Sequence, residues 1–292
     1  MTTATTQNEM GRKEAQSHAL QCMEVWGGNR EIQSGITVPG IDGWISSEPY
    51  HAQERGGDIH YLSLCGMGKI SRFTIADVSG HGDSAADVAD RLRALLRKHI
   101  NTVDQTKLAR ALNREFNRLA ESGRFATALL ATYFAPTDHL IICNAGHPRP
   151  LWYSAETNTW RLLDEHMSWQ AESVRNLPLG VIQPTEYSQF AVKLGRGDLV
   201  LLYTDSLIEA RDRDGARLGE AGLLELAADI GPTEPEVFVQ ELTGRADAHR
   251  GGEAPDDDQT LLVLHHNGES PPPPSMSEKI RIMAKMVGLL GE

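Results

Sequence analysis

Apolar and polar residues alternate along two neighbouring segments, residues 58–64 and 70–78. A period of two is typical of strands that bury one face. The glycine-containing stretch 65–69 separates the segments, so we predict a β-hairpin. The same signals predict two further hairpins, 125–134 with 140–144 and 189–194 with 199–204, and single strands at 151–153, 160–163 and 260–265.

Helical periodicity takes over in four other segments. Apolar residues recur at spacings of three and four over residues 83–100, where Asp83 or Ser84 can cap the helix, and over 105–120. Two more helical stretches lie near 220–229 and 234–249. Hairpins combined with paired helices favour an α+β layered fold over a parallel βαβ sheet.

Composition and polarity divide the chain into four parts. Residues 1–35 are expected to form a flexible N-terminal extension with a candidate short helix, and residues 36–267 a single globular domain. A Pro-rich linker follows at 268–276. Residues 277–292 fit an amphipathic helix that carries Ile280, Met283, Met286, Val287 and Leu290 on one side.

Overall composition excludes several classes of protein. Hydrophobic residues make up 40% of the chain, enough for a core, and the net charge of −12 argues against nucleic-acid binding through phosphate contacts. The three cysteines fit no zinc spacing and are typical of reduced cytosolic thiols. No apolar run approaches a signal peptide or a membrane span, so we expect a cytoplasmic protein.

Two aspartates stand out in the first predicted hairpin. A symmetric turn centred on Met67-Gly68 places Asp58 directly opposite Asp77, with Cβ atoms about 5 Å apart. The same register opposes Leu62 and Phe73, so both aspartates lie on the core-facing side. Like charges opposed there are destabilising unless something neutralises them, and a bound cation is the simplest remedy.

Two further acidic positions adjoin predicted strands. Asp205 follows the strand 199–204, and the run 256–258 precedes the strand 260–265. Each feature alone has a plainer explanation, as a turn residue, a helix cap or solvated surface. Four acidic sites at strand ends can instead converge on one point, where all-oxygen ligands would select Mg²⁺ or Mn²⁺.

Six short motifs occur in the order expected for one family: Gly56-Gly57-Asp58, Asp77-Val78-Ser79-Gly80-His81-Gly82, Asn144-Ala145-Gly146-His147-Pro148, Leu177-Pro178-Leu179-Gly180, Tyr203-Thr204-Asp205-Ser206-Leu207-Ile208-Glu209-Ala210 and Asp257-Asp258-Gln259-Thr260-Leu261-Leu262. Over residues 56–264 the chain resembles the metal-dependent (protein phosphatase 2C-like) protein phosphatases, in the bacterial branch of stage II sporulation protein E. The resemblance implies a four-layer αββα sandwich of two antiparallel sheets flanked by helix pairs.

The resemblance also implies roles for individual residues. Asp77 would bridge two divalent cations, Mn²⁺ or Mg²⁺, and Val78 would offer its backbone carbonyl to one of them. Asp58, Asp205 and Asp257 would be the other ligands, with Asp257 preferred to Asp258 because the family ligand comes first in its motif.

Three departures from the family pattern leave the catalytic groups incomplete. Ser206 replaces the usual glycine, and Ser79 stands where the eukaryotic branch has a general-acid histidine. His81 is a weaker candidate for an active-site role, and His147 is better explained as structural. No counterpart of the eukaryotic phosphate-clamping arginine is evident, so no general acid is assigned.

The function implied by the resemblance is hydrolysis of phosphoserine or phosphothreonine by a water that two metals activate. The substrate would be a phosphoprotein, such as the anti-sigma-factor antagonists of bacterial partner-switching pathways, with control by a partner through the N-terminal extension or the C-terminal helix. The main alternative is a catalytically silent binding module with the same fold. Another kind of metallohydrolase is a third option, whereas a P-loop NTPase lacks its signature.

Overall fold

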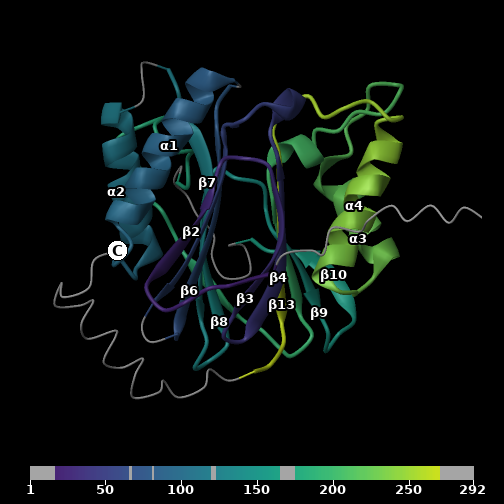
Figure 1. Ribbon diagram of the computed structural model, residues 1–292, viewed down its shortest axis with the longest axis horizontal. Coiled ribbons are helices and arrows are strands. Elements are labelled where there is room, and N and C mark those ends of the chain that lie inside the picture. The colour runs from purple at the N-terminus through teal and green to yellow at the C-terminus, as the bar shows by residue number, and fades with distance from the viewer. Residues whose placement is uncertain (1–16, 66–67, 81, 120–122, 165–174, 270–292) are drawn as a thin grey trace, which may run out of the picture.

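Two β-sheets pack face to face in the computed structural model, which describes residues 17–65, 68–80, 82–119, 123–164 and 175–269. Helices α1 and α2 cover the outer face of one sheet, and α3 and α4 cover the outer face of the other (Figure 1). The expected four-layer α+β sandwich is therefore confirmed. No helix within the described ranges is long and apolar enough to cross a membrane.

The six-stranded sheet has the order β11-β8-β7-β6-β5-β2. Its strands are β11 (Phe190–Lys193), β8 (His139–Ala145), β7 (Ala126–Phe134), β6 (Ile70–Val78), β5 (Asp58–Cys65) and β2 (Glu24–Gly28). Its covering helices are α1 (Asp83–Lys98) and α2 (Gln105–Leu119). All neighbouring strands in this sheet run antiparallel.

The seven-stranded sheet has the order β1-β3-β4-β13-β12-β9-β10. Its strands are β1 (Ser17–Ala19), β3 (Ile32–Val38), β4 (Ile41–Glu48), β13 (Gln259–His266), β12 (Leu199–Tyr203), β9 (Leu151–Ser154) and β10 (Thr159–Leu162). Its covering helices are α3 (Gly219–Ile230) and α4 (Pro235–His249). β1 and β3 run parallel, and the other pairs are antiparallel.

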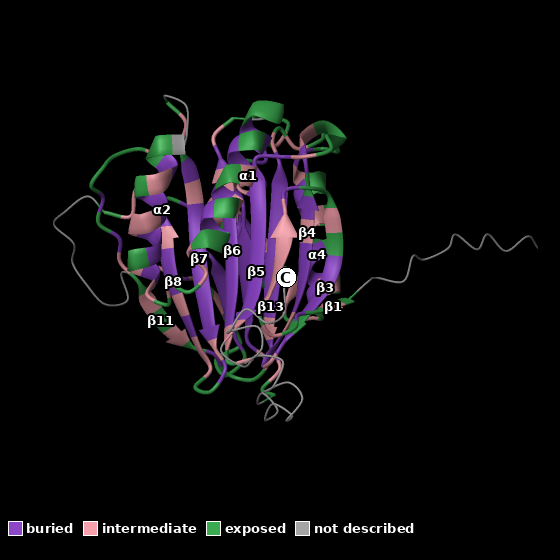
Figure 2. Ribbon diagram, turned by 60° about the vertical axis from the view of Figure 1, so that its left-hand side comes forward, coloured by how far each residue is buried: buried purple, intermediate pink, exposed green. Residues whose placement is uncertain are grey.

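Strand alternation builds separate cores on the two faces of each sheet. On β5, Leu62 and Leu64 face the other sheet, whereas Ile59 and Tyr61 pack against the helical layer of α1 and α2. Strands β5 to β7 are buried along almost their whole length, while the outward faces of these helices are exposed (Figure 2). The side of β5 and β6 that carries Leu62 is therefore the side between the sheets.

The structure differs from the sequence-based expectation in two places. Residues 17–35, expected within a flexible extension with a short helix, contain β1, β2 and the start of β3, which join edges of both sheets. Residues 189–194 and 199–204 were expected to pair as a hairpin, yet β11 joins the six-stranded sheet and β12 the other. The N-terminal residues 1–16 and the predicted C-terminal helix lie outside the described residues.

The side chain of Asp198 explains why this third hairpin does not form. Its carboxylate accepts hydrogen bonds from Trp152 Nε1 at 3.0 Å and from the backbone N–H groups of Gly195 and Ala155, both at 2.9 Å. These bonds fix the chain at the start of β12 against β9, so it crosses from one sheet to the other instead of folding back on β11.

Candidate metal centre between the two sheets

Asp58 and Asp77 are paired across β5 and β6, as the predicted register requires. Asp58 is the first residue of β5 and is only 3% exposed, whereas Asp77, one residue before the end of β6, is partly exposed. Both share the face of Leu62 and Phe73, which pack between the sheets. The two carboxylates therefore sit together at one end of the inter-sheet space.

The other sheet contributes Asp205 and Asp257. Asp205 opens the short 3₁₀-helix η3 (Asp205–Leu207) directly after β12, and Asp257 precedes β13 by two residues. β12 and β13 are antiparallel neighbours with Tyr203 opposite Leu261, so these two carboxylates belong to the same end of their sheet.

A hydrogen bond between the sheets brings the two pairs together. The hydroxyl of Thr204, between β12 and Asp205, donates to Asp58 Oδ2 at 2.8 Å. The end of β12 therefore lies against the start of β5. All four predicted carboxylate ligands consequently lie where these two strands meet.

The pKa values of three of the aspartates show how strongly the cluster disfavours negative charge. Burial raises the pKa of Asp58 well above its usual range, and repulsion from Asp77 and Asp258 adds to the shift. Burial, then Asp205 and Asp257, raise the pKa of Asp77 to about 8. The pKa of Asp205 is also raised, first by burial and then by Glu209 and Asp257. Divalent cations would oppose each of these repulsions, so this all-oxygen donor set fits Mg²⁺ or Mn²⁺.

The side chains do not form a complete coordination shell as they stand. Over the described ranges, no group of three or more His, Cys, Asp or Glu residues has a geometry that could hold a metal ion. The cluster is thus defined by strand register, by the bond from Thr204 to Asp58 and by mutual repulsion. The assignment of individual ligands remains a prediction.

Asp258 has a structural role that the sequence interpretation missed. Its carboxylate is buried and accepts the backbone N–H of Tyr50 at 2.7 Å and that of Gly57 at 2.5 Å. A Cβ atom at Gly56 would lie 2.5 Å from Asp258 Oδ1, so the first glycine of the Gly56-Gly57-Asp58 motif leaves room for this carboxylate. The paired glycines were the signal that could have revealed a close neighbour.

Of the two histidines singled out in the sequence, His81 and His147, the structure describes only His147. His81 lies outside the described residues. His147 is buried, its Nδ1 lies 2.8 Å from Thr127 Oγ1, and burial lowers its pKa to about 3. Asn144 bonds both backbone groups of His147, accepting from its N–H and donating to its C=O. A neutral imidazole enclosed in this way has the structural role expected for His147.

Ser206 occupies ordinary helical backbone. It lies within η3, and it is absent from the non-glycine residues of the described chain that have positive φ. The backbone conformation at this position is therefore one that serine can adopt as readily as glycine. The departure at this position leaves the local backbone intact.

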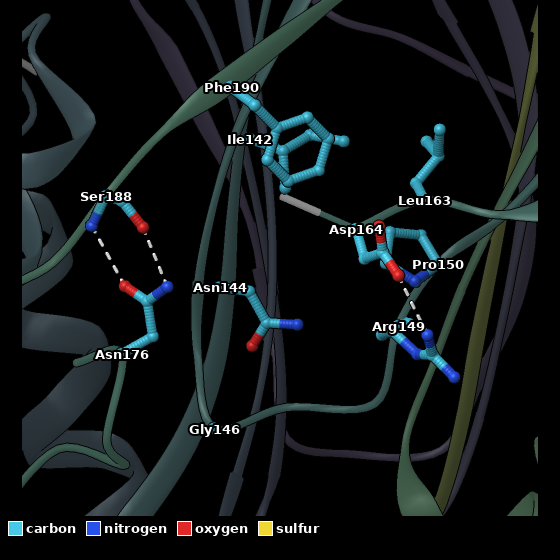
Figure 3. A pocket seen from close by; sticks show the side chains of 10 residues that line it. All are labelled: Ile142, Asn144, Gly146, Arg149, Pro150, Leu163, Asp164, Asn176, Ser188 and Phe190. Atoms are coloured by element: carbon cyan, nitrogen blue, oxygen red, sulfur yellow. Dashed lines mark hydrogen bonds and ion pairs between the residues drawn. The ribbon is translucent and has the colours of Figure 1, made fainter. Parts of the chain in front are cut away.

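A cavity of about 270 Å³ is lined by residues that include Asn144, Arg149 and Phe190 (Figure 3). None of the four predicted carboxylate ligands lines it. Arg149 in its wall is paired with Asp164 and Glu220, at 2.9 and 2.5 Å. The cavity is therefore distinct from the candidate metal centre.

The chain is similar to known proteins in both sequence and fold. The family description Stage II sporulation protein E (SpoIIE) matches residues 68–267. The phosphoserine phosphatase RsbU of Bacillus subtilis is 28% identical over 165 residues, which cover 56% of this chain and 46% of RsbU. The chain thus spans less than half the length of that curated relative.

Solved structures share the fold. The RsbU and RsbW domains of a Mycobacterium tuberculosis protein superpose with a TM-score of 0.66 at 24% identity, covering 89% of this chain and 70% of that one. RsbX in complex with magnesium gives a TM-score of 0.56 at 15% identity, covering 80% of this chain and 99% of that one. These structures show that the fold is shared, and the family match over residues 68–267 shows that the chain belongs to the stage II sporulation protein E family.

Proposed function

We propose that this protein is a metal-dependent protein serine/threonine phosphatase. The observation that carries the proposal is that carboxylates from two sheets lie together beside the bond from Thr204 to Asp58. Burial and repulsion from neighbouring carboxylates raise the pKa values of three of them, Asp58, Asp77 and Asp205. Such an arrangement costs stability unless cations offset it, which is typical of a site kept for a function.

Two divalent cations, Mn²⁺ or Mg²⁺, would be held by Asp58, Asp77, Asp205 and Asp257 and by the backbone carbonyl of Val78. Cations in such a site lower the pKa of water from about 15.7 towards 7 and offset negative charge on phosphoryl oxygens. Thr204 keeps the Asp58 carboxylate oriented, and Asp258 holds the backbone just before it through Gly57 N–H. The sequence has neither a Gly-x-Ser-x-Gly elbow nor a nucleophilic-cysteine signature, in keeping with direct attack by water.

The substrate we propose is a phosphoserine or phosphothreonine of another protein. RsbU is named a phosphoserine phosphatase, which supports this choice of ester. A phosphorylated anti-sigma-factor antagonist in a cytoplasmic partner-switching pathway fits the family. Residues at either end of the chain are proposed to receive a regulatory partner.

Hydrolysis of p-nitrophenyl phosphate tests the proposal without knowledge of the natural substrate. We expect activity with Mn²⁺ or Mg²⁺, loss of activity with EDTA, and loss in Asp77→Asn. Asp256→Asn is the matched control, because Asp256 is an exposed member of the same acidic loop as Asp257. Activity that survives both EDTA and Asp77→Asn would overturn the proposal. Inactivity with every divalent cation and with phosphoproteins would instead support the catalytically silent binding module.

A further inference from the structure

Ser79 lies two residues after Asp77, and its N–H, its C=O and its hydroxyl oxygen each take part in a hydrogen bond. Its N–H donates to Phe125 O at 2.9 Å, and its Oγ accepts Phe125 N–H at 3.1 Å. Its C=O accepts a hydrogen bond from Arg124 Nη1, also at 2.9 Å. Arg124 and Phe125, the two residues just before β7, thus form a clamp on Ser79.

This clamp sets the direction in which the Val78 carbonyl points. In a trans peptide the C=O and the following N–H point in opposite directions. Because Ser79 N–H points at Phe125, on the β7 side, the Val78 carbonyl must point to the β5 side. The structure agrees, since a Cβ atom built on Gly57 would lie 3.0 Å from Val78 O. Gly57 immediately precedes Asp58, so this carbonyl is aimed beside a predicted ligand.

Arg124 also extends the clamp to the first turn of α1. Its Nη2 donates to Ser84 Oγ at 2.7 Å, and a Cβ atom at Gly80 would lie 3.4 Å from its Nη1. Gly80 and Gly82, both at positive φ, have no side chains with which to brace the connection between β6 and α1. The guanidinium of Arg124, two residues before β7, contacts both sides of this connection through Ser79 O and Ser84 Oγ.

We propose that Arg124 and Ser79 are positioning residues that orient the Val78 carbonyl as a metal ligand. The inference rests on the proposed function, because it assumes that the aspartate cluster binds divalent cations. Nη1 and Nη2 of Arg124 each donate a hydrogen bond to the protein, so the guanidinium holds the backbone around Ser79 in place. Groups that orient metal ligands typically affect metal affinity about 10- to 100-fold.

Direct measurement of Mn²⁺ binding tests this inference independently of activity. Free Mn²⁺ is quantified by electron paramagnetic resonance during titration of wild type, Arg124→Gln and Ser79→Ala. We expect the dissociation constant of one Mn²⁺ to rise roughly tenfold in Arg124→Gln and less in Ser79→Ala, which keeps both backbone bonds. In p-nitrophenyl phosphate assays the half-activating Mn²⁺ concentration should rise likewise, while saturating Mn²⁺ restores turnover.

Two controls separate positioning from general destabilisation. Arg124→Lys, which retains one charged donor, should lie between wild type and Arg124→Gln. Arg110→Gln removes a comparable arginine of α2, bonded to Glu186 and Thr106, and should leave Mn²⁺ affinity unchanged. Thermal unfolding of each variant shows whether it is folded, and Ser79→Ala provides the test if Arg124→Gln fails to fold.

The outcomes distinguish this inference from the proposed function. If wild type binds Mn²⁺ and hydrolyses p-nitrophenyl phosphate but the folded variants bind Mn²⁺ equally well, the clamp has no positioning role and the inference is wrong. If wild type neither binds Mn²⁺ nor hydrolyses the ester, the proposed function itself fails.

Discussion

The hydroxyl of Thr204 joins the two sheets by donating a 2.8 Å hydrogen bond to the carboxylate of Asp58. The same oxygen accepts the backbone N–H of Thr260 at 2.9 Å, so one buried side chain connects β5, β12 and β13. Both bonds lie at the candidate metal centre. The orientation of Asp58 therefore depends on how the two sheets meet.

Replacement of Thr204 by valine tests the strength of this connection. The change keeps the shape of the side chain but leaves Thr260 N–H and Asp58 Oδ2 without this partner. We expect a loss of about 1–3 kcal/mol in the free energy of unfolding, measured with urea, together with weaker Mn²⁺ binding. In the control, Thr243→Val, the lost hydroxyl bonds only carbonyls of its own helix. An equal loss in both variants would contradict the structural role of Thr204.

Alanine substitutions of Asp257 and Asp258 should have opposite effects. Asp257→Ala removes a predicted ligand, so Mn²⁺ binding and p-nitrophenyl phosphate hydrolysis should be lost while stability without metal is retained or increased. Asp258→Ala leaves the N–H groups of Tyr50 and Gly57 without their acceptor, at a cost of about 1–3 kcal/mol for each. Thermal unfolding in EDTA and Mn²⁺ titration separate the two. Interchanged effects would show that Asp258 is the ligand.

The raised pKa of Asp77 predicts how stability depends on pH in EDTA. Its pKa rises from 3.8 to about 8 on folding, so the folded state binds the proton more tightly than the unfolded state. The stability that this proton contributes is complete below pH 3.8 and is lost as the pH rises towards 8.

Melting temperatures in EDTA between pH 5 and 8.5 measure this loss against Asp77→Asn, in which position 77 cannot ionise. Wild type should lose stability relative to the variant as the pH rises, and saturating Mn²⁺ should reverse the trend because cations bind the ionised form. Parallel profiles in EDTA would contradict the raised pKa.

A methyl group at Gly56 should disturb the acidic loop. A Cβ atom there would lie 2.5 Å from Asp258 Oδ1, closer than side chains can approach, so Gly56→Ala forces the carboxylate to move. We expect a loss of about 1–3 kcal/mol in unfolding free energy, measured with urea. Gly244→Ala is the matched control. Nothing lies within 4 Å of that position in α4, so alanine should stabilise the helix by roughly 0.5–1 kcal/mol. Stabilisation by both substitutions would contradict the predicted crowding at Gly56.

The hairpin of Asp58 and Asp77 could be predicted from sequence because both of its determinants are local. A short turn and strict alternation define the register, and the register opposes the two aspartates. Asp205 and Asp257 could be placed only at strand ends, since β12 and β13 meet across more than fifty residues of chain. The pattern indicated only that all four could converge, and the family resemblance assigned them as ligands of one site.

Features that depend on distant side chains escaped the sequence interpretation. The contact of Asp258 with Gly57 joins residues 201 positions apart, and the bond of Arg124 to Ser79 spans 45. The crossing between β11 and β12 depends on Asp198, whose carboxylate has no distinguishing pattern around it. The N-terminal strands β1 to β3 are short or rich in polar residues and glycine, which weakens the alternation that predicts a strand.

β13 is the last described strand along the chain, yet it lies at the centre of the seven-stranded sheet, between β4 and β12. During synthesis on the ribosome, the hairpin of β5 and β6 emerges long before residues 259–266 can join β4 to β12. A nascent chain therefore carries Asp58 and Asp77 without Asp257 or the backbone N–H of Thr260 that holds Thr204. If Asp257 is a ligand as proposed, competence to bind cations would then arrive only when the final strand inserts.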